Sequence, residues 1–516
     1  MRIIPFLLAL FCTGMLHSQV NLLPIHSFYK DQTFANKQTE PFNSGDFFPY
    51  TESNYDLLDV INDSTKQYYD VTETLFKKHL FELKGDGYYL TISPAFNFSV
   101  GADLEDTTNT RLTRNTRGFL VEGDLLEKVS FSTSFYENQA TFARYASNYF
   151  SDAGELYLNQ NGYFTQNAVI PGEGRTKDFK ESGFDFGYAI GNVVYRPWKQ
   201  LTIAFGNNGH FIGSGHRSLL LSDNSYSAPY FRIDWKVHEK LQVRVLRSKL
   251  LNLLRRPFTS SAESYYEAKG YSVNYLTWTP NQNFNLSLFE GVIWNRGDSV
   301  SYRSAHPLFY NPVPGIAGIL GSNEVNSMIG LNASFQLKDV HRLYGQIAVP
   351  NWTFDRTGFQ AGYRGYNFFG LNDFMLQVEY NYIPEEMYAA QNPRLNYIHY
   401  NLPLGNTRGD GIQEILLRSN YEFKRAYVDV LVSYMMLRNY NPRGLLPTNA
   451  LIDPGTESSF NTTNIQIEVG YRFNRKMNFS VFARNVIRRS TADDPINGTI
   501  FQAGMRTALL NQYDDF

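Results

Sequence analysis

The hairpin at residues 462–488 limits the possible folds more than any other part of the sequence, because its apolar and polar residues alternate. In its first half every second residue is apolar: Ile465, Ile467, Val469, Tyr471 and Phe473. Since successive side chains of a β-strand point to opposite faces, this period of two gives one apolar and one polar face. After a turn at 474–476, the residues at 477–484 alternate in the same sense. The stretch therefore predicts an amphipathic β-hairpin.

The same pattern recurs along the chain from Asp86 onward. It predicts eighteen strands, at 87–104, 112–124, 127–138, 182–196, 200–208, 228–237, 240–250, 265–279, 283–295, 327–338, 342–350, 358–366, 373–383, 412–424, 426–438, 462–474, 477–488 and 498–510. Such strands suit a barrel with lipid outside and a polar lumen inside. A soluble sandwich could use the same alternation with its apolar face inward.

The lengths of the connections separate these two folds. Seven short turns join even-numbered strands to the next odd ones, at 125–127, 197–199, 237–240, 280–283, 338–341, 424–425 and 474–476. The long connections have the other parity, at 139–181, 209–227, 296–326, 384–411 and 439–461. A membrane barrel sorts its loops in this way, with short periplasmic turns and long outer loops. The sequence thus predicts an all-β fold, a transmembrane antiparallel β-barrel of about 18 strands over 86–516, with a secreted sandwich or solenoid as the alternative.

Composition fits a barrel and argues against a nucleic-acid partner. The 516 residues carry a formal net charge of −2, so no basic excess is available for phosphate binding. Aromatic residues make up 16% of the chain and charged residues only 19%. This excess of Tyr and Phe suits strands and the aromatic girdles of a membrane barrel.

The first nineteen residues are laid out as a secretory signal peptide. Arg2 precedes an apolar run at 3–16, and a short polar stretch at 17–19 follows. The one cysteine, Cys12, lies inside this run, and bulky Phe11 disfavours its lipidation. The mature chain is therefore predicted to lack disulfides and thiol chemistry. Since no later segment approaches 18 consecutive apolar residues, the expected location is the bacterial outer membrane or the exterior.

Residues 20–85 are expected to form a periplasmic lead-in. Three prolines at 24, 41 and 49 indicate an irregular start, and apolar residues then recur at helical spacing over 51–83. Because this segment precedes the first strand, we expect a helix that lies on the periplasmic side or plugs that mouth of the barrel.

The connection at 209–224 contains the first candidate ligand site. His216, Arg217, Asp223 and Asn224 combine hydrogen-bond donors and acceptors with neighbouring glycines. The alternative is an ordered loop folded into the barrel mouth, with Arg217 paired to Asp223.

The second candidate site lies at 396–405 and at the start of the following strand. Tyr397, His399, Asn401 and Glu414 place aromatic rings beside amide and carboxylate groups, which suits sugars. The alternative is a Tyr-rich girdle with a Pro-Gly loop. Four tyrosines of the 139–181 connection pose the same choice: Tyr145, Tyr149, Tyr157 and Tyr163.

Catalysis and metal binding are not expected. The stretch Gly213-Ser214-Gly215 is not a nucleophile elbow, and the nine histidines are scattered without metal-ligand spacing, so we predict no enzyme, no metal and no cofactor. Six charged residues are placed on the polar faces of strands: Glu414, Arg418, Glu422, Glu468, Arg472 and Arg484. They could line a channel or pair across a closed interior, and their mixed signs favour pairing.

These features together resemble the Wzi-type capsule-assembly outer-membrane proteins, and in particular their Bacteroidetes relatives, some of which are labelled gliding-motility proteins. The resemblance is carried by the signal peptide, the helical segment, the strand count, GHRSLLLSDN at 215–224 with Pro229, and NYIHYNLPL at 396–404 with Glu414. It implies an eighteen-stranded barrel closed by N-terminal helices.

The resemblance also implies a function and partners. Outer loops would act as a lectin that retains capsular or other exopolysaccharide, with outer-membrane lipid around the barrel and, in gliding relatives, secretion or motility proteins beside it. The alternative function is a channel or solute transporter, because a barrel of this size encloses an aqueous bore unless something fills it.

Overall fold

The computed structural model of the protein describes residues 22, 25–27, 30–31, 46–50, 78–107, 111–126, 128–255, 266–296, 304–317, 324–338, 340–475, 477–507 and 511–515. The predicted signal peptide at 1–19 and most of the predicted helix at 51–83 lie outside these residues.

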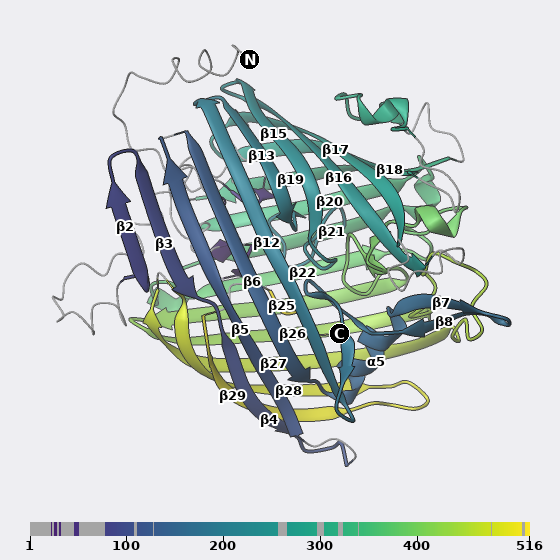
Figure 1. The fold of residues 1–516 in the computed structure, drawn as a ribbon. Helices are drawn as coiled ribbons and strands as arrows, with labels where there is room; N and C mark the ends of the chain where they lie inside the picture. Colours follow the sequence, from purple (N-terminus) through teal and green to yellow (C-terminus); the bar gives the residue numbers. More distant parts are fainter. Residues whose placement is uncertain are drawn as a thin grey trace, which may run out of the picture.

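Antiparallel strands close into a barrel of eighteen wall strands, of which the first is interrupted and forms β3 and β4 (Figure 1). The wall consists of β3 (Tyr88–Pro94), β4 (Asn97–Asp103), β5 (Arg111–Leu125), β6 (Val129–Thr141), β12 (Gly183–Trp198), β13 (Leu201–Asn208), β15 (Ala228–His238), β16 (Leu241–Arg255), β17 (Tyr266–Asn281), β18 (Phe284–Asn295), β19 (Val325–Leu337), β20 (His341–Pro350), β21 (Gly358–Gly365), β22 (Met375–Ile383), β25 (Ile412–Phe423), β26 (Ala426–Tyr440), β27 (Ser458–Asn474), β28 (Phe479–Ser490) and β29 (Gly498–Arg506). β3 and β4 both pair with β5, each strand from β5 onward pairs with the next in this order, and β29 pairs with β4 to close the ring.

The shorter elements are not strands of this ring. They are β1 (Phe47–Phe48), β2 (Phe81–Gly85), α5 (Arg144–Asp152), β7 (Glu155–Asn159), β8 (Gly162–Gln166), β9 (Val169–Ile170), β10 (Gly174–Arg175), β11 (Lys177–Phe179), β14 (Phe211–Ile212), β23 (Ile398–His399), β24 (Leu402–Pro403) and the 3₁₀ turns η3 (Pro307–Phe309), η4 (Phe354–Arg356), η5 (Phe368–Gly370) and η6 (Pro393–Leu395). None of the helices in the described part of the chain is long and apolar enough to cross a bilayer.

All eighteen predicted strands are found, so the all-β barrel and its strand number are confirmed. Most boundaries agree within three residues, but β16 continues to Arg255 rather than 250 and β27 begins at Ser458 rather than 462. Two further differences are linked. The last strand ends at Arg506 rather than at 510, and the final residues of the expected helix belong to β2. The two differences have one cause. Because β29 leaves the wall at the level of Asn97, the lower part of β3 lacks a neighbour on that side, and β2 pairs with it.

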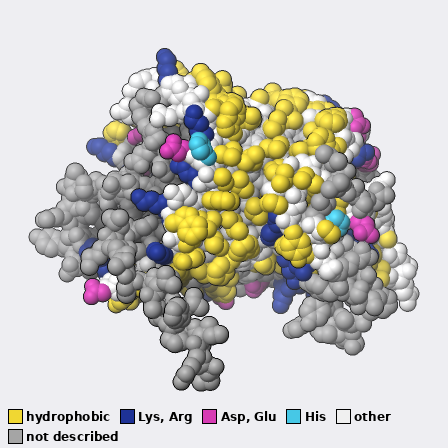
Figure 2. Space-filling view, turned by 90° about the horizontal axis from the view of Figure 1, so that it is seen from above, with side chains coloured by type: hydrophobic (Ala, Val, Ile, Leu, Met, Phe, Trp, Pro, Cys, Tyr) yellow, Lys and Arg dark blue, Asp and Glu magenta, His cyan; other side chains and the backbone are white. Residues whose placement is uncertain are grey.

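The polarity of the wall is inverted relative to a soluble protein. On β27 the exposed side chains are apolar, with Ile467 at 41%, Val469 at 46% and Tyr471 at 42% exposure. The polar side chains on the other face are turned inward: Gln466 and Arg472 are buried, and Glu468 is half-buried. Figure 2 shows this on one side of the wall, where hydrophobic side chains form a broad patch and charged residues lie mainly toward its edges. This arrangement suits a lipid surrounding and excludes the soluble sandwich.

Loop length follows strand parity. At one rim the connections are 126–128, 199–200, 239–240, 282–283, 338–340, 366–374, 424–425 and 475–478. At the other rim they are 104–110, 142–182, 209–227, 256–265, 296–324, 351–357, 384–411, 441–457 and 491–497. Only 366–374 departs from the sorting of short and long. Three exposed tryptophans, Trp198, Trp235 and Trp278, mark the short-turn rim like one girdle of a membrane barrel.

The lipid-facing surface generates a stability prediction. We expect Val469→Arg to destabilise the folded barrel by about 2–4 kcal/mol, because the substitution moves a cation into hydrocarbon. The measurement is a urea titration of the protein in phospholipid vesicles. Val469→Leu is the matched control and should leave the midpoint nearly unchanged. Equal stability of the Arg and Leu variants would contradict an outward lipid face.

Candidate functional site

The two stretches predicted to bind ligand meet inside the barrel. The Ser222 amide donates a hydrogen bond to the Leu404 carbonyl at 2.7 Å, and the Asn224 side-chain amide donates to the Pro403 carbonyl at 3.2 Å. The Tyr397 hydroxyl donates to the Leu220 carbonyl at 2.7 Å. The loops at 209–227 and 384–411 are therefore one structural unit that occupies the lumen.

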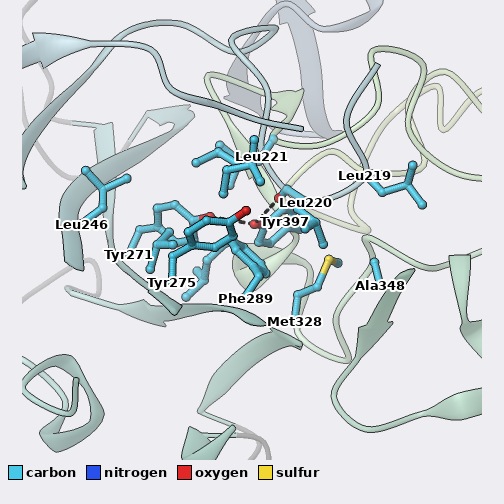
Figure 3. Close-up of a cluster of buried hydrophobic side chains, with 14 of the residues drawn as sticks. Leu219, Leu220, Leu221, Leu246, Tyr271, Tyr275, Phe289, Met328, Ala348 and Tyr397 are labelled. Atoms are coloured by element: carbon cyan, nitrogen blue, oxygen red, sulfur yellow. Dashed lines mark hydrogen bonds between the residues drawn. The ribbon is translucent and has the colours of Figure 1, made fainter. Parts of the chain in front are cut away.

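An apolar cluster holds this unit against the wall (Figure 3). Its labelled members are Leu219, Leu220, Leu221, Leu246, Tyr271, Tyr275, Phe289, Met328, Ala348 and Tyr397. The inward loops supply the three leucines and Tyr397, and β16 to β20 supply the others. The Tyr271 and Tyr397 hydroxyls lie 2.6 Å apart, so their polar ends are satisfied within the cluster. Full burial of a side chain of this size contributes about 1.5–3 kcal/mol.

Arg217 is the charged centre of the unit. Its guanidinium lies 2.9 Å from a Glu414 carboxylate oxygen and 2.8 Å from an Asp515 carboxylate oxygen, and all three side chains are buried. Glu414 also accepts hydrogen bonds from Ser433 at 2.9 Å and Asn381 at 3.1 Å. Arg217 thus connects the inward loop to β25 of the wall through Glu414 and to the segment after β29 through Asp515.

The charges of this pair are stabilised by each other. Burial acts to raise the pKa of the Asp515 carboxyl, but the Arg217 guanidinium and His216 hold that pKa well below its usual range. Burial likewise acts to lower the pKa of the Arg217 guanidinium, while Asp515 and Glu414 hold it well above its ordinary value. The ion pair therefore persists across the physiological pH range.

The predicted pairing of Arg217 with Asp223 is wrong. Asp223 instead accepts hydrogen bonds from the Asn511 side chain at 3.0 Å and from the Tyr513 hydroxyl. The reason is that residues 511–515, which sequence reasoning did not assign to the site, enter the lumen. Asp515 pairs with Arg217, and Asn511 and Tyr513 bind Asp223. The prediction that the loop folds into the barrel is confirmed.

His399 and Asn401 hold the second inward loop against β16. The Leu251 amide donates to His399 Nδ1 at 2.9 Å, and the Leu253 amide donates to the Asn401 side-chain oxygen at 3.1 Å. Burial lowers the pKa of His399 to about 3, so its ring stays neutral and remains an acceptor. The girdle alternative for Tyr397 is wrong, since its ring is 1% exposed inside the lumen.

The eight predicted ligand residues are therefore gathered in one region but are mostly closed to solvent. Six are less than 5% exposed: Arg217, Asn224, Tyr397, His399, Asn401 and Glu414. His216 and Asp223 are half-buried. Sequence reasoning also missed Glu379, which accepts hydrogen bonds from the backbone amides of His216 and Arg217 at 2.8 and 3.0 Å. Gln377, Glu379 and Asn381 occupy every second position of β22, and this alternation could have indicated that Glu379 faces the lumen.

The predicted pairing of lumen charges is confirmed. Arg418 lies 2.8 Å from Asp429, Arg472 lies 2.9 Å from Glu422, and Arg484 lies 2.8 Å from Asp514. Glu468 pairs with Arg506. Between these groups and the inward segments, three cavities of about 190, 70 and 50 Å³ are found among the described residues. No cluster of three His, Cys, Asp or Glu that could hold a metal occurs in the described part of the chain.

A hairpin of β7 and β8 remains outside the lumen, beside the rim that carries the long loops (Figure 1). Buried Glu155 anchors it through ion pairs with Arg175 at 3.1 Å and with Arg255. The Tyr157 and Phe164 rings stack at 5.9 Å with an interplanar angle of 29°. Of the four tyrosines predicted in this connection, Tyr145 and Tyr149 are buried, whereas Tyr157 and Tyr163 are half-exposed.

Comparison with known proteins supports the fold. No family model matches the sequence, and no curated protein matches it. Among solved structures, Wzi, an Escherichia coli outer membrane protein involved in group 1 capsule assembly and a carbohydrate-binding β-barrel, is similar with a TM-score of 0.50 at 10% identity, covering 81% of this chain and 85% of that chain. The chain has the fold of an outer-membrane β-barrel.

Two Pseudomonas aeruginosa structures also match this chain. OpdQ has a TM-score of 0.42 at 10% identity and covers 82% of this chain and 98% of its own. OccK7 (OpdD) has a TM-score of 0.44 at 8% identity, with the same coverage of 82% and 98%.

The buried Arg217 network generates one prediction. We expect Arg217→Ala to destabilise the protein by about 3–5 kcal/mol, because it leaves two buried carboxylates without their cation. Arg356→Ala is the control, since its pair with Glu386 is exposed and should contribute below about 1 kcal/mol. The measurement is denaturant unfolding in detergent or vesicles. Similar midpoints for the two variants would show that the network is not a stabilising centre.

The buried imidazole of His399 generates a pH prediction. The folded protein keeps the ring neutral down to about pH 3, whereas the unfolded chain takes up a proton near the ordinary pKa of 6.5. The stability that the neutral His399 ring contributes is therefore fully present above pH 6.5 and is lost as the pH falls towards 3. Between pH 7 and pH 5 we expect His399→Asn to lose about 2 kcal/mol less stability than the wild type. Exposed His238→Asn should follow the wild type, and parallel curves for all three proteins would refute the assignment.

Proposed function

We propose that this protein is an outer-membrane β-barrel of a Gram-negative bacterium that holds capsular or other exopolysaccharide at the cell surface through its outer loops, and that it is not an enzyme. The observation that carries the proposal is the joining of the loops at 209–227 and 384–411 inside the lumen. Because packed side chains fill much of the bore there, the loops that remain outside form the surface available to a large ligand. The carbohydrate binding ascribed to Wzi, which has a similar fold, supports the same choice.

The hairpin of β7 and β8 is the proposed glycan contact. Sugars pack their C–H faces on aromatic rings and satisfy their hydroxyls with amide groups. Phe164 is 37% exposed and stacks with Tyr157, and residues 156–166 carry no charged side chain. Four exposed amide side chains lie on the same hairpin: Asn159, Gln160, Asn161 and Gln166.

In this proposal the buried residues among the eight predicted from sequence have a positioning role. Arg217 and Glu414 tie the first inward loop to the wall, and His399 and Asn401 tie the second to β16. Asn401 also donates to the Gly154 carbonyl at 2.8 Å, immediately before β7. The inward loops thereby support the base of the outer hairpin from within the barrel.

The alternative function, a channel or solute transporter, would require an open lumen. A channel needs a continuous aqueous path, whereas the inward loops pack against the wall inside the lumen, and residues of the loop at 209–227 line the cavities of about 190 and 70 Å³. Steady conductance of the wild-type protein in a planar bilayer would favour the channel.

Glycan binding by the hairpin is tested with a double substitution. We expect Tyr157→Ala with Phe164→Ala to weaken binding of the cell's own surface polysaccharide by about tenfold or more, equivalent to about 1.4 kcal/mol. The measurement is binding of purified polysaccharide to the immobilised protein. Phe368→Ala with Phe369→Ala removes two aromatic rings at the short-turn rim and should leave binding unchanged. The proposal fails if the wild type binds no polysaccharide and a deletion strain keeps its polysaccharide coat.

A further inference from the structure

The chain leaves the barrel wall after β29 and turns inward. The Thr507 amide donates to the Phe96 carbonyl at 2.8 Å, and the Thr507 hydroxyl donates to the Pro94 carbonyl at 2.7 Å, at the junction of β3 and β4. This point lies partway up the wall, since β29 pairs with β4 but not with β3, and β2 pairs with β3 below it. The chain beyond Thr507 is therefore not needed to complete the sheet, and residues 511–515 lie inside the lumen.

Residues 511–515, called the tail segment here, are held mainly by polar contacts. The Asp514 carboxylate lies 2.8 Å from the Arg484 guanidinium, and the Asp515 carboxylate lies 2.8 Å from Arg217 and 3.6 Å from His216 Nε2. The Tyr145 hydroxyl donates to the Asp514 carbonyl at 2.8 Å. Water or a competing anion can replace these polar contacts, whereas Tyr513 is also buried in an apolar cluster that contains Tyr145 and Phe150.

The tail segment borders each of the three cavities described above. It contributes Asn511, Gln512, Tyr513 and Asp515 to the cavity of about 190 Å³, Asn511 to that of about 70 Å³, and Gln512, Tyr513 and Asp514 to that of about 50 Å³. The largest cavity reaches Glu422 close to a short turn, and the smallest reaches Phe142 and Ile170 in a long outer connection. The segment thus lies between a space on the short-turn side and a space on the outer side.

The groups that pair with the two carboxylates of the tail segment are cationic. Six Lys and Arg line the largest cavity (Lys30, Arg364, Arg418, Arg472, Arg484 and Arg506). Five Asp and Glu line it as well (Asp31, Glu422, Asp429, Glu468 and Asp515). Withdrawal of Asp515 leaves four carboxylates against five arginines and Lys30, and withdrawal of Asp514 removes the ion-pair partner of Arg484. The vacated site would therefore attract an anion of carboxylate size and geometry.

We propose that residues 511–515 are a removable plug, and that the groups they cover, Arg484 and Arg217 with His216, form a luminal binding site for small carboxylate-bearing solutes. The side chains of Asp514 and Asp515 occupy the positions that solute carboxylates take when the tail segment is displaced. Withdrawal joins the largest and smallest of these cavities, which share Asn97, Arg484 and Arg506, into a path along β4 and β27 to β29, so the same event exposes the site and opens the lumen. This inference is independent of the glycan contact on the outer hairpin, which lies outside the lumen.

The plug is tested by neutralising its two carboxylates. We expect Asp514→Asn with Asp515→Asn to raise the open conductance in planar bilayers at least tenfold over the wild type, with a reversal potential that shows anion preference. In liposome swelling, the variant should admit glucuronate several-fold faster than uncharged glucose. Asp493→Asn with Asp494→Asn is the matched control, because both aspartates are exposed in the outer connection between β28 and β29 and should leave the barrel closed.

A second variant keeps the test decisive if the substituted tail segment stays in place. A chain ending at Thr507 lacks the tail segment but keeps every wall strand, and its folding is checked by heat-modifiable migration in gels. We expect it to conduct like the double variant. The plug is refuted if this folded, shortened protein is as silent as the wild type, or if the wild type conducts equally well. The carboxylate site is refuted if the opened barrel admits glucose and glucuronate at the same rate.

Discussion

The whole architecture depends on satisfying the backbone polar groups of the wall within the protein, as a barrel placed in lipid must do. A sheet closed on itself meets this need, because each wall strand has a partner on both sides. Closure then dictates side-chain placement, with apolar residues such as Val469 outward and polar residues such as Gln466 inward. It also explains β2, which takes over the pairing with β3 at the point where β29 leaves the wall.

An inward polar face creates a second problem, since charged side chains must be paired once the lumen is filled. The protein solves this with a set of ion pairs across neighbouring strands and with segments that enter from both ends of the chain. Arg217 joins three of these parts, because it contacts β25 through Glu414 and the tail segment through Asp515. Asp46 near the start of the chain pairs with Arg342 of β20 and accepts from Ser214, which brings in a fourth part. Such buried pairs bring specificity of placement, because each partner left alone would be a costly buried charge.

The inner and outer parts of the loops therefore have separate tasks. The loops at 209–227 and 384–411 make a packed apolar and polar interior, whereas the hairpin of β7 and β8 projects beyond it. Asn401 connects the two by binding both β16 and the residue before β7. A barrel built in this way can present a rigid outer surface to a large ligand while its lumen stays closed by contacts of unequal strength, apolar for the loops and ionic for the tail segment.

The sequence by itself determined the wall. Period-two alternation and the parity of loop length depend only on local residue order, so they identified the strands, the barrel and the outward apolar face. The same reasoning could not assign partners to Arg217 and Asp223, because those partners lie hundreds of residues away on β25 and in the tail segment. Chemistry that suits a ligand, as at Tyr397 or His399, suits a buried hydrogen-bond network equally well. Only the tertiary structure decides which of the two forms, because burial and partner distance depend on how closure brings remote segments together.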